Sequence, residues 1–344
     1  MTGVGAPGTW GTVFSLATNF DNREIRAVGC DANADVVGRR ICCKFHQVPR
    51  GDEEGFIDEI QRICILEDID VILPQCTSEL EPLAKAKDTL KNQGTVVATS
   101  DYEAVVLANN KCALMRVAEE ARVPIPEHGL ARNFEELETL AFKLGYPEKP
   151  IVVKPPVSRG MRGLRIIDSK LERSNLFWTE KPSGIEVTLD DLKFLEKSDW
   201  LSPLLVMEHL PGREYSVDVL ANAGHTVVAV PRSRDSLRSG ITFTGSTDPV
   251  PELIEYAERL TARIGLSYAF GFQFKQDCEG QHRLIECNPR IQGSMFLTVG
   301  SGANIIYGAV KLALNEALPD FKVKWGSRMF RYWGMVIEKE IVER

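Results

Sequence analysis

Short apolar runs alternate with segments of helical periodicity over the first hundred residues, and this alternation constrains the fold more than any other feature. Apolar runs that predict strands end at Asp31, Pro74 and Ala98. The neighbouring segments that predict helices are 9–19, 52–65 and 82–92. Strands separated by helices of about ten residues are typical of a parallel sheet with crossover helices. The sequence therefore predicts an α/β fold that begins with such a sheet.

A glycine-rich turn stands at the start of this region. Gly3, Gly5 and Gly8 have the spacing of dinucleotide-binding turns, in which the backbone approaches a pyrophosphate at a helix N-terminus. Asp31 follows Gly8 by about the distance at which such sites place a ribose-binding acid. Only two residues precede Gly3, however, whereas the fingerprint normally follows a strand. A tight turn without a ligand therefore remains an alternative explanation.

Composition excludes several classes of partner. The formal net charge is −7 and there is no basic tract, so the sequence offers no electrostatic footprint for nucleic acid or an anionic membrane. No apolar run approaches the roughly 18 residues of a membrane span, and residues 1–5 lack the features of a signal peptide. The eight cysteines include no C-x-x-C pair, which indicates reduced thiols. We therefore expect a cytoplasmic protein without nucleic-acid or membrane partners.

Beyond residue 108 the pattern changes to longer strands and separate helices. Apolar or alternating runs predict strands at 150–154, 164–167, 204–208 and 214–220. Helical periodicity is found at 111–122, 134–144, 190–195, 251–264 and 304–314. Segments 155–163 and 169–183 predict loops, the first of them glycine-containing.

A hairpin near residue 280 carries the most informative polar residues. If its turn centres between Glu279 and Gly280, Gln273 lies directly opposite Glu286, with Cβ atoms about 4.5–5.5 Å apart. Alternation along the strands then places Gln273, Glu286 and Asn288 on one face. The opposite, core-facing residues are Phe272, Phe274, Ile285 and Cys287.

Three oxygen-bearing side chains on one face suit a hard cation such as Mg²⁺. Arg290 follows the second strand, where a guanidinium group can clamp a phosphate or a carboxylate through two hydrogen bonds. The same alternation also fits the solvated polar face of an ordinary hairpin. The pattern alone leaves these two interpretations open.

Glu286-Cys-Asn-Pro-Arg290, preceded by Gln273, resembles the metal-binding signature of the ATP-grasp superfamily, most closely its carbamoyl-phosphate-synthase-like branch. Other segments resemble further motifs of that family in the expected order, and residues 1–100 resemble its pre-ATP-grasp domain. These segments are Asn110-Lys111, Val153-Lys154-Pro155, the loop 158–163, and 207–214.

The resemblance implies an α/β fold with a Rossmann-like pre-ATP-grasp domain (1–108), followed by a two-lobed ATP-grasp domain divided into 109–206 and 207–344. It assigns nucleotide contacts to Lys111, Lys154, Arg159, Gly160, Gly163, Glu208, His209, Leu210 and Glu214. It assigns the metal to Gln273, Glu286 and Asn288, and catalytic roles to Asn288 and Arg290.

The resemblance also implies an ATP-dependent, ADP-forming ligase that activates a carboxylate as an acylphosphate and joins it to an amine. Its cofactors would be ATP and Mg²⁺, with Mn²⁺ as the alternative ion, and its partners a small-molecule carboxylate and an amine. The expected partners include a second copy of the chain in a homodimer. For the substrate site, the sequence offers Arg232, Arg234 and Arg238 as anion-binding groups, and Glu79 beyond the strand that ends at Pro74.

Two other classes of function stay open. A nicotinamide-dependent oxidoreductase would use the glycine turn and Asp31, but it would leave the series from Lys154 to Arg290 without a role. An ATP-binding sensor or regulatory module without turnover would keep the nucleotide motifs and lack a productive acceptor site.

Overall fold

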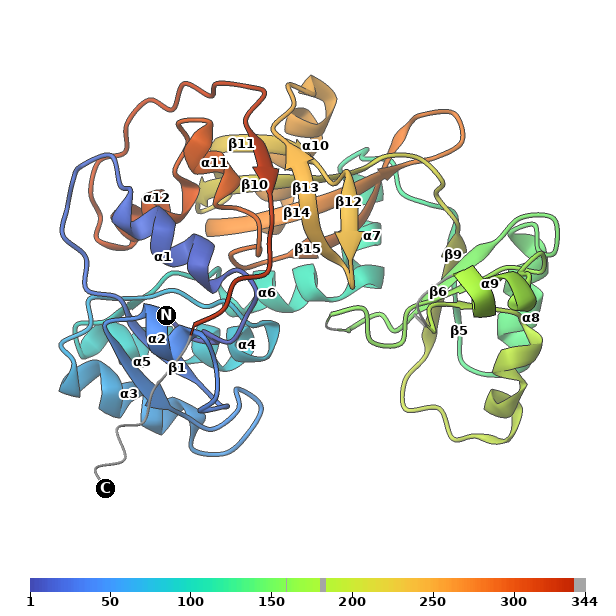
Figure 1. Cartoon of the computed structure of the whole chain (residues 1–344), viewed down its shortest axis with the longest axis horizontal. Helices are drawn as coiled ribbons and strands as arrows, with labels where there is room; N and C mark the ends of the chain where they lie inside the picture. Colours follow the sequence, from blue (N-terminus) through green and yellow to red (C-terminus); the bar gives the residue numbers. More distant parts are fainter. Residues whose placement is uncertain (159, 180–183, 337–344) are drawn as a thin grey trace. The chain divides into compact units, whose positions relative to one another are not determined.

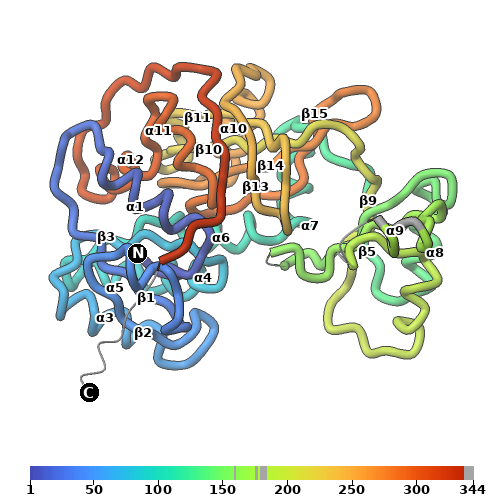
Figure 2. Tube along the Cα trace, in the orientation of Figure 1, coloured from blue at the N-terminus to red at the C-terminus, as the bar shows by residue number. Residues whose placement is uncertain are grey.

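The computed structural model describes residues 1–158, 160–179 and 184–336, and by internal contacts it forms two compact units. Unit 1 comprises Met1–Ala108, Tyr215–Gln273 and Cys287–Arg344, and unit 2 comprises Asn109–Glu214 and Phe274–Glu286. The division of the sequence into 1–108, 109–206 and 207–344 stays a prediction. Figures 1 and 2 show the course of the chain.

A parallel sheet forms the first part of unit 1. Its named strands are β1 (Val28–Asp31), β2 (Lys44–Gln47), β3 (Val71–Ile72) and β4 (Val96–Val97). Strands β1 and β2 pair in parallel, as do β3 and β4. The chain's first residues join the two pairs, because Thr2 bridges Cys30 in parallel and its N–H donates to the Leu73 carbonyl at 3.2 Å. A short extended segment thus precedes the glycine turn, and the strand order becomes β2–β1–first segment–β3–β4.

Helices surround this sheet because their apolar residues recur on one face. They are α1 (Thr9–Ala17), α2 (Gly38–Ile41), α3 (Phe56–Leu66), α4 (Thr77–Lys85), α5 (Lys87–Asn92) and α6 (Tyr102–Asn109). Phe56, Ile60, Leu83 and Leu90 are buried in one cluster with strand residues such as Ile72. The predicted helix at 82–92 is two helices, α4 and α5.

A second set of longer strands lies mostly in unit 1, whereas its residues Glu214 and Phe274–Glu286 belong to unit 2. The sheet order is β11–β10–β14–β15, with β10 (Glu214–Asn222), β11 (His225–Ser233), β14 (Tyr268–Gln276) and β15 (His282–Asn288). A three-stranded sheet follows the order β12 (Ser236–Arg238), β13 (Ile241–Ser246), β16 (Arg328–Phe330). The helices here are α10 (Pro251–Ile264), α11 (Leu297–Gly300) and α12 (Ile305–Ala313).

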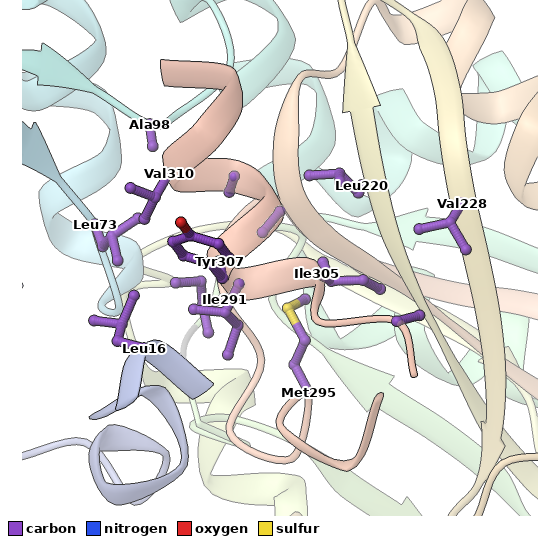
Figure 3. Packing of buried hydrophobic residues seen from close by; sticks show 14 of the residues in the cluster. Leu16, Leu73, Ala98, Leu220, Val228, Ile291, Met295, Ile305, Tyr307 and Val310 are labelled. Carbon is purple, nitrogen blue, oxygen red and sulfur yellow. The ribbon is translucent and has the colours of Figure 1, made fainter. Parts of the chain in front are cut away.

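One apolar cluster joins the two parts of unit 1. Figure 3 shows Leu16 and Leu73, from the first hundred residues, in the same cluster as Ile305 and Tyr307 of α12. Leu220 of β10 belongs to the cluster as well. Each of these side chains is at most 4% exposed. The N-terminal sheet and the later antiparallel sheet therefore share a core.

Unit 2 is built on a five-stranded sheet with the order β5–β9–β6–β7–β8. Its strands are β5 (His128–Ala131), β6 (Ile151–Lys154), β7 (Arg165–Ile167), β8 (Glu186–Val187) and β9 (Leu204–Glu208). Its helices are α7 (Lys111–Glu120), α8 (Phe134–Lys143), α9 (Arg173–Thr179) and the 3₁₀ helix η1 (Asp190–Lys197). Phe134, Leu137, Ile151 and Val206 lie in its core.

The prediction of a loop over 169–183 is wrong for α9. Its aromatic residues Phe177 and Trp178 are adjacent in sequence and 77% and 81% exposed. No helical period of buried residues therefore marked the segment. Strands β11 and β13 were also missing from the sequence prediction. No helix of the described ranges is both long enough and apolar enough to span a membrane.

Candidate functional site

The hairpin of β14 and β15 has a different turn from the predicted one. The Asp277 N–H donates to the Gln281 carbonyl at 3.0 Å, and the Gly280 N–H donates to the Asp277 carbonyl at 3.2 Å. Gly280 has φ +83°. These features define a three-residue loop whose last residue is left-handed, a common alternative to two-residue turns. The turn centres on Glu279, so the direct opposition predicted for Gln273 and Glu286 no longer follows.

Three of the four predicted core-facing residues of the hairpin are buried. Phe272 and Phe274 are fully buried, and Cys287 is 6% exposed. Ile285 is partly buried and packs against Met115 and neighbouring apolar residues of unit 2.

Among the predicted metal ligands, Gln273 is buried, whereas Glu286 and Asn288 are half-buried. No group of three or more His, Cys, Asp or Glu side chains in the described ranges is placed to hold a metal. A cation at the hairpin would therefore need the amide oxygens of Gln273 and Asn288 besides the Glu286 carboxylate. Such oxygen ligands suit Mg²⁺.

Lys154 is a buried cation at the end of β6. Its Nζ donates to the Ile285 carbonyl at 3.2 Å. Burial lowers the pKa of Lys154 to about 8, and the positive charge of Lys111 lowers it further, whereas the carboxylates of Glu286 and Glu214 raise it. These four predicted site residues thus interact electrostatically within unit 2. Two lysines in a poorly hydrated place can bind an anionic ligand, with Glu286 and Glu214 as the opposing charges.

Lys111 is held at the start of α7 and linked to the loop after β6. The side-chain oxygen of Asn110 caps α7 by accepting from the Cys112 N–H at 3.1 Å. The Lys111 N–H donates to the Pro156 carbonyl at 3.0 Å, and its Nζ lies 3.3 Å from Ser158 Oγ. Lys111 is only 5% exposed. The capped helix therefore presents a fixed cation to the glycine-containing loop.

That loop uses left-handed backbone at three of its residues. Gly160, Met161 and Gly163 have φ of +56°, +63° and +75°. At Gly163 an added Cβ would lie 2.7 Å from Pro155 Cδ, so a side chain does not fit there. Glycines at such positions let backbone N–H groups approach phosphate oxygens. Arg159 lies outside the described residues.

The predicted adenine hinge follows β9. The carboxylate of Glu208 accepts from the Glu127 N–H at 3.0 Å and lies 3.6 Å from Arg283 Nε. It therefore fixes the end of β9 to neighbouring backbone. Burial lowers the pKa of His209, and Leu210 is buried. A neutral, enclosed hinge suits a planar, uncharged ring better than a charged group.

Arg290 bridges two segments of unit 1 that are far apart in sequence. Its Nε donates to Thr77 Oγ1 at 3.2 Å, at the start of α4. Its Nη2 donates to Asn288 Oδ1, also at 3.2 Å. Asn288 and Arg290 therefore lie close to the start of α4, beyond the carboxyl end of β3.

The three arginines of the predicted substrate segment have different environments. Arg232 is fully buried, and its Nε and Nη2 donate to the Asp218 carboxylate at 2.6 and 3.2 Å. Its Nη2 also donates to Gln292 Oε1 at 2.8 Å. Arg238 is exposed, so the structure does not bring these two guanidinium groups into one site.

Arg234 and Arg238 lie near the β12–β13 connection. The Nη2 of Arg234 donates to the Gly240 carbonyl at 2.8 Å. The guanidinium of Arg238 lies 4.6 Å from the centre of the Phe243 ring. These contacts are compatible with a surface role, and Arg238 keeps its charge toward solvent.

Glu79 is buried in the first turn of α4. Its Oε2 accepts from Thr2 Oγ1 at 2.6 Å and from the Cys76 N–H at 3.4 Å. Burial raises the pKa of Glu79 to about 7. Close by, the buried Gln75 bonds to Thr12 Oγ1 at 2.8 Å. The residues predicted beyond the third parallel strand are therefore enclosed rather than loop-like.

The glycine turn is closed by the chain itself. Gly5 N–H donates to the Asp31 carboxylate at 2.7 Å. A Cβ added at Gly8 would lie 2.7 Å from Gly293 Cα, so the start of α1 packs on this backbone. The approach that a pyrophosphate needs at the helix start is thus occupied. This arrangement disfavours the nicotinamide interpretation.

Arg331 was missed by the sequence analysis. Its guanidinium donates to the carbonyls of Thr242, Pro7 and Gly293 at 3.1, 2.8 and 2.7 Å. All three partners are backbone groups, which leave no residue-type signal in a sequence. Arg331 therefore fastens the glycine turn and the segment after Arg290 to β13.

Two family descriptions match this chain. "ATP-grasp in the biosynthetic pathway with Ter operon" matches residues 201–330. "PylC-like, N-terminal domain" matches residues 6–98.

Curated relatives include large chains of carbamoyl phosphate synthase. That of Caldanaerobacter subterraneus is 22% identical over 252 residues, which cover 70% of this chain and 22% of the relative. That of Streptomyces griseus is 37% identical over 247 residues, covering 68% of this chain and 21% of the relative. The chain thus spans about a fifth of the length of these relatives.

Solved structures share the fold. Campylobacter jejuni biotin carboxylase, in a β,γ-ATP complex, aligns with a TM-score of 0.68 and 18% identity, covering 93% of this chain and 71% of that one. N5-carboxyaminoimidazole synthetase from Staphylococcus aureus, complexed with ADP, gives a TM-score of 0.65 and 16% identity, with 92% and 77% coverage.

Fold and site together define an α/β protein with a Rossmann-like N-terminal domain followed by an ATP-grasp domain. The chain belongs to the ATP-grasp superfamily, in its carbamoyl-phosphate-synthase-like branch.

Proposed function

We propose that the chain is an ATP-dependent, ADP-forming ligase that activates a carboxylate as an acylphosphate and joins it to an amine. The observation that carries this proposal is the buried pair Lys154 and Lys111, beside Glu286 in unit 2. Two enclosed ammonium groups next to a glycine-containing loop suit the phosphates of a nucleotide.

Each described group has a part in this proposal. Lys111 and Lys154 neutralise phosphate charge, and the backbone at Gly160 and Gly163 covers the phosphates. The hinge backbone at His209 and Leu210 would hold adenine. Glu214 would accept the ribose hydroxyl groups, and Glu208 fixes the hinge through Glu127.

The proposed metal ligands belong to the hairpin of β14 and β15, not to the hinge or to the two lysines. Mg²⁺, or Mn²⁺ in its place, would supply positive charge that neutralises the phosphates. Glu286 would hold it, with Gln273 and Asn288 as the further predicted ligands. Arg290 would orient the attacking carboxylate and stabilise the transferred phosphoryl group. Catalysis would then depend on position and charge, without a covalent protein nucleophile.

The partners proposed are a small-molecule carboxylate and an amine, with a homodimer as the assembly. The substrate site would include Glu79, and Arg234 or Arg238 for an acidic group. Arg232 would act there only through Gln292, because its guanidinium is committed to Asp218. We place the protein in the cytoplasm, since no disulfide joins its eight cysteines, all of which lie in the described ranges.

Release of ADP tests the proposal. The wild type, incubated with MgATP and a panel of amino acids, dicarboxylates and amines, should release ADP only when acid and amine are both present. Glu286→Ala should reduce this turnover by at least about a hundredfold, because a ligand to the phosphate-bound cation is lost.

Glu279→Ala is the matched control, since Glu279 is an exposed turn residue of the same hairpin. It should keep wild-type turnover. Equal turnover in the Glu286→Ala variant would remove the hairpin from the mechanism. ATP binding without ADP release across the whole panel would favour a sensor.

A further inference from the structure

We propose that Glu79 binds the protonated amino group of a substrate, so that one ligand of this protein is an amine or an amino acid. The inference rests on the proposed function in one respect, namely that this ligand is taken to be one of the two substrates of the ligase.

The position of Glu79 in the sheet supports a binding role. Strand order places the first segment, which contains Thr2, beside β3, whereas β1 lies on the other side of that segment. Successive strands are therefore added on one side of the first segment up to β2 and on its other side from β3 onward. Open α/β sheets bind ligands beyond the carboxyl ends of their strands at this switch point. Glu79 bonds to residues from both sides of it, Thr2 and Cys76, and Figure 1 shows α4, which carries it.

Local structure uses only one oxygen of the carboxylate. Both hydrogen bonds go to Oε2, and in the described part of the chain no donor is bonded to Oε1. Glu79 is 6% exposed. The Cys76 N–H, at the helix cap, and the Thr2 hydroxyl account for Oε2. Oε1 makes no hydrogen bond in the described part of the chain, so it can accept one from a ligand ammonium group.

The charge around Glu79 selects a cation. Asp31 of β1 adds negative charge to that of Glu79, and the N-terminal amino group supplies a smaller opposing contribution. An added Cβ at Gly3 would lie 3.3 Å from Glu79 Oε1, and at Gly5 3.0 Å from Asp31 Oδ2, so both carboxylates border the glycine turn. A carboxylate or phosphate would be repelled there, whereas an ammonium group would be attracted.

The position also fits the proposed chemistry. Arg290 donates to Thr77, two residues before Glu79 on the same helical turn. A ligand with its ammonium group at Glu79 therefore lies near the guanidinium that we assign to the carboxylate. A free amine would use Glu79 alone, and an amino acid would use both charges.

Thermal unfolding with small probes tests the inference. Methylammonium, L-alanine, D-alanine and L-lysine would be added to the wild type at pH 8 and equal ionic strength, with propionate as the carboxylate-only probe. At least one amine probe should raise the unfolding temperature by a few degrees, and propionate should not. A shift with methylammonium as large as that with the amino acids indicates a site for the amino group alone. A larger shift with the amino acids indicates that Glu79 and Arg290 both contact the ligand.

Variants then locate the site. Glu79→Gln should abolish the shift, and it should itself be more stable than the wild type at pH 8, because the neutral amide resembles the protonated acid that the fold favours. Glu81→Gln, on the same helix, should keep the shift. The inference fails if no amine probe stabilises the wild type, if propionate stabilises it equally, or if Glu79→Gln keeps the shift. MgATP binding, measured on the same samples, tests the proposed function separately, since Glu79→Gln should retain it.

Discussion

The buried positive charge of Lys154 destabilises the folded protein, but it can bind an anionic ligand. Its pKa is lowered to about 8, so the folded state disfavours the charged form relative to the unfolded chain. A base of this kind binds fewer protons when folded. The free energy of unfolding should therefore rise between pH 8 and about 10.5, where the unfolded chain still holds this proton.

Lys154→Met should separate the two effects. Removing the buried charge should stabilise the protein at pH 7 by up to about 3 kcal/mol, the free energy equivalent of the pKa shift. The same change should abolish MgATP binding, because a charge-assisted bond to phosphate is lost. Thermal unfolding and calorimetric titration measure both. Lys149→Met, at an exposed lysine, should change neither, and a destabilised variant that still binds MgATP would contradict this account.

Residue-type signals explain which site residues were predictable. Lys154 and Glu286 were predicted from charged side chains on or beside apolar strands, and Lys111 was assigned by the family resemblance. The structure groups the three electrostatically. Arg232 shares their chemistry but is enclosed with Asp218, and its partner lies 14 positions earlier on another strand. Sequence spacing cannot distinguish these environments, because burial depends on which strands pair. Arg331 could not be found at all, since it recognises backbone carbonyls.

At the scale of elements, hydrophobic periodicity predicted the helices that pack one face against the core. Helices such as α7, α8 and α10 were predicted because their buried residues repeat every three or four positions. Helix α9 exposes adjacent aromatic residues, so it lacked that signal. The hairpin was predicted from its alternation, but its three-residue turn was not, since Gly280 permits several turn lengths.

The loop between β6 and β7 gives a prediction at this scale. Gly163→Ala would place a Cβ 2.7 Å from the Pro155 ring at φ +75°, where an L-residue costs about 1–2 kcal/mol. The loop should abandon this conformation, and MgATP affinity should fall about tenfold, as measured by calorimetry. Gly94→Ala is the control, with φ +94° and open space around it. It should lose similar stability without losing affinity, and equal affinities in both variants would exclude the loop from binding.

At the scale of the whole molecule, unit 1 is assembled from three stretches of chain. The apolar cluster of Figure 3 joins the first stretch to the last through Leu16, Leu73 and Tyr307. Arg331 adds a polar connection of the same kind. No local pattern encodes such contacts, because they form only after distant segments have folded together.

Arg331→Lys should therefore weaken unit 1 more than its conservative chemistry suggests. A guanidinium serves three carbonyls here, whereas an ammonium group on a flexible stem reaches at most part of them. Loss of two bonds from a charged donor should cost about 3 kcal/mol. Hydrogen exchange in increasing denaturant should show a lower free energy of unfolding at α1 and β13 of unit 1. Exchange at β6 and β9 of unit 2 should stay unchanged. Arg328→Lys, at an exposed arginine of the same strand region, should have little effect. Equal destabilisation by the two variants, or uniform loss across both units, would show that Arg331 does not hold these segments together.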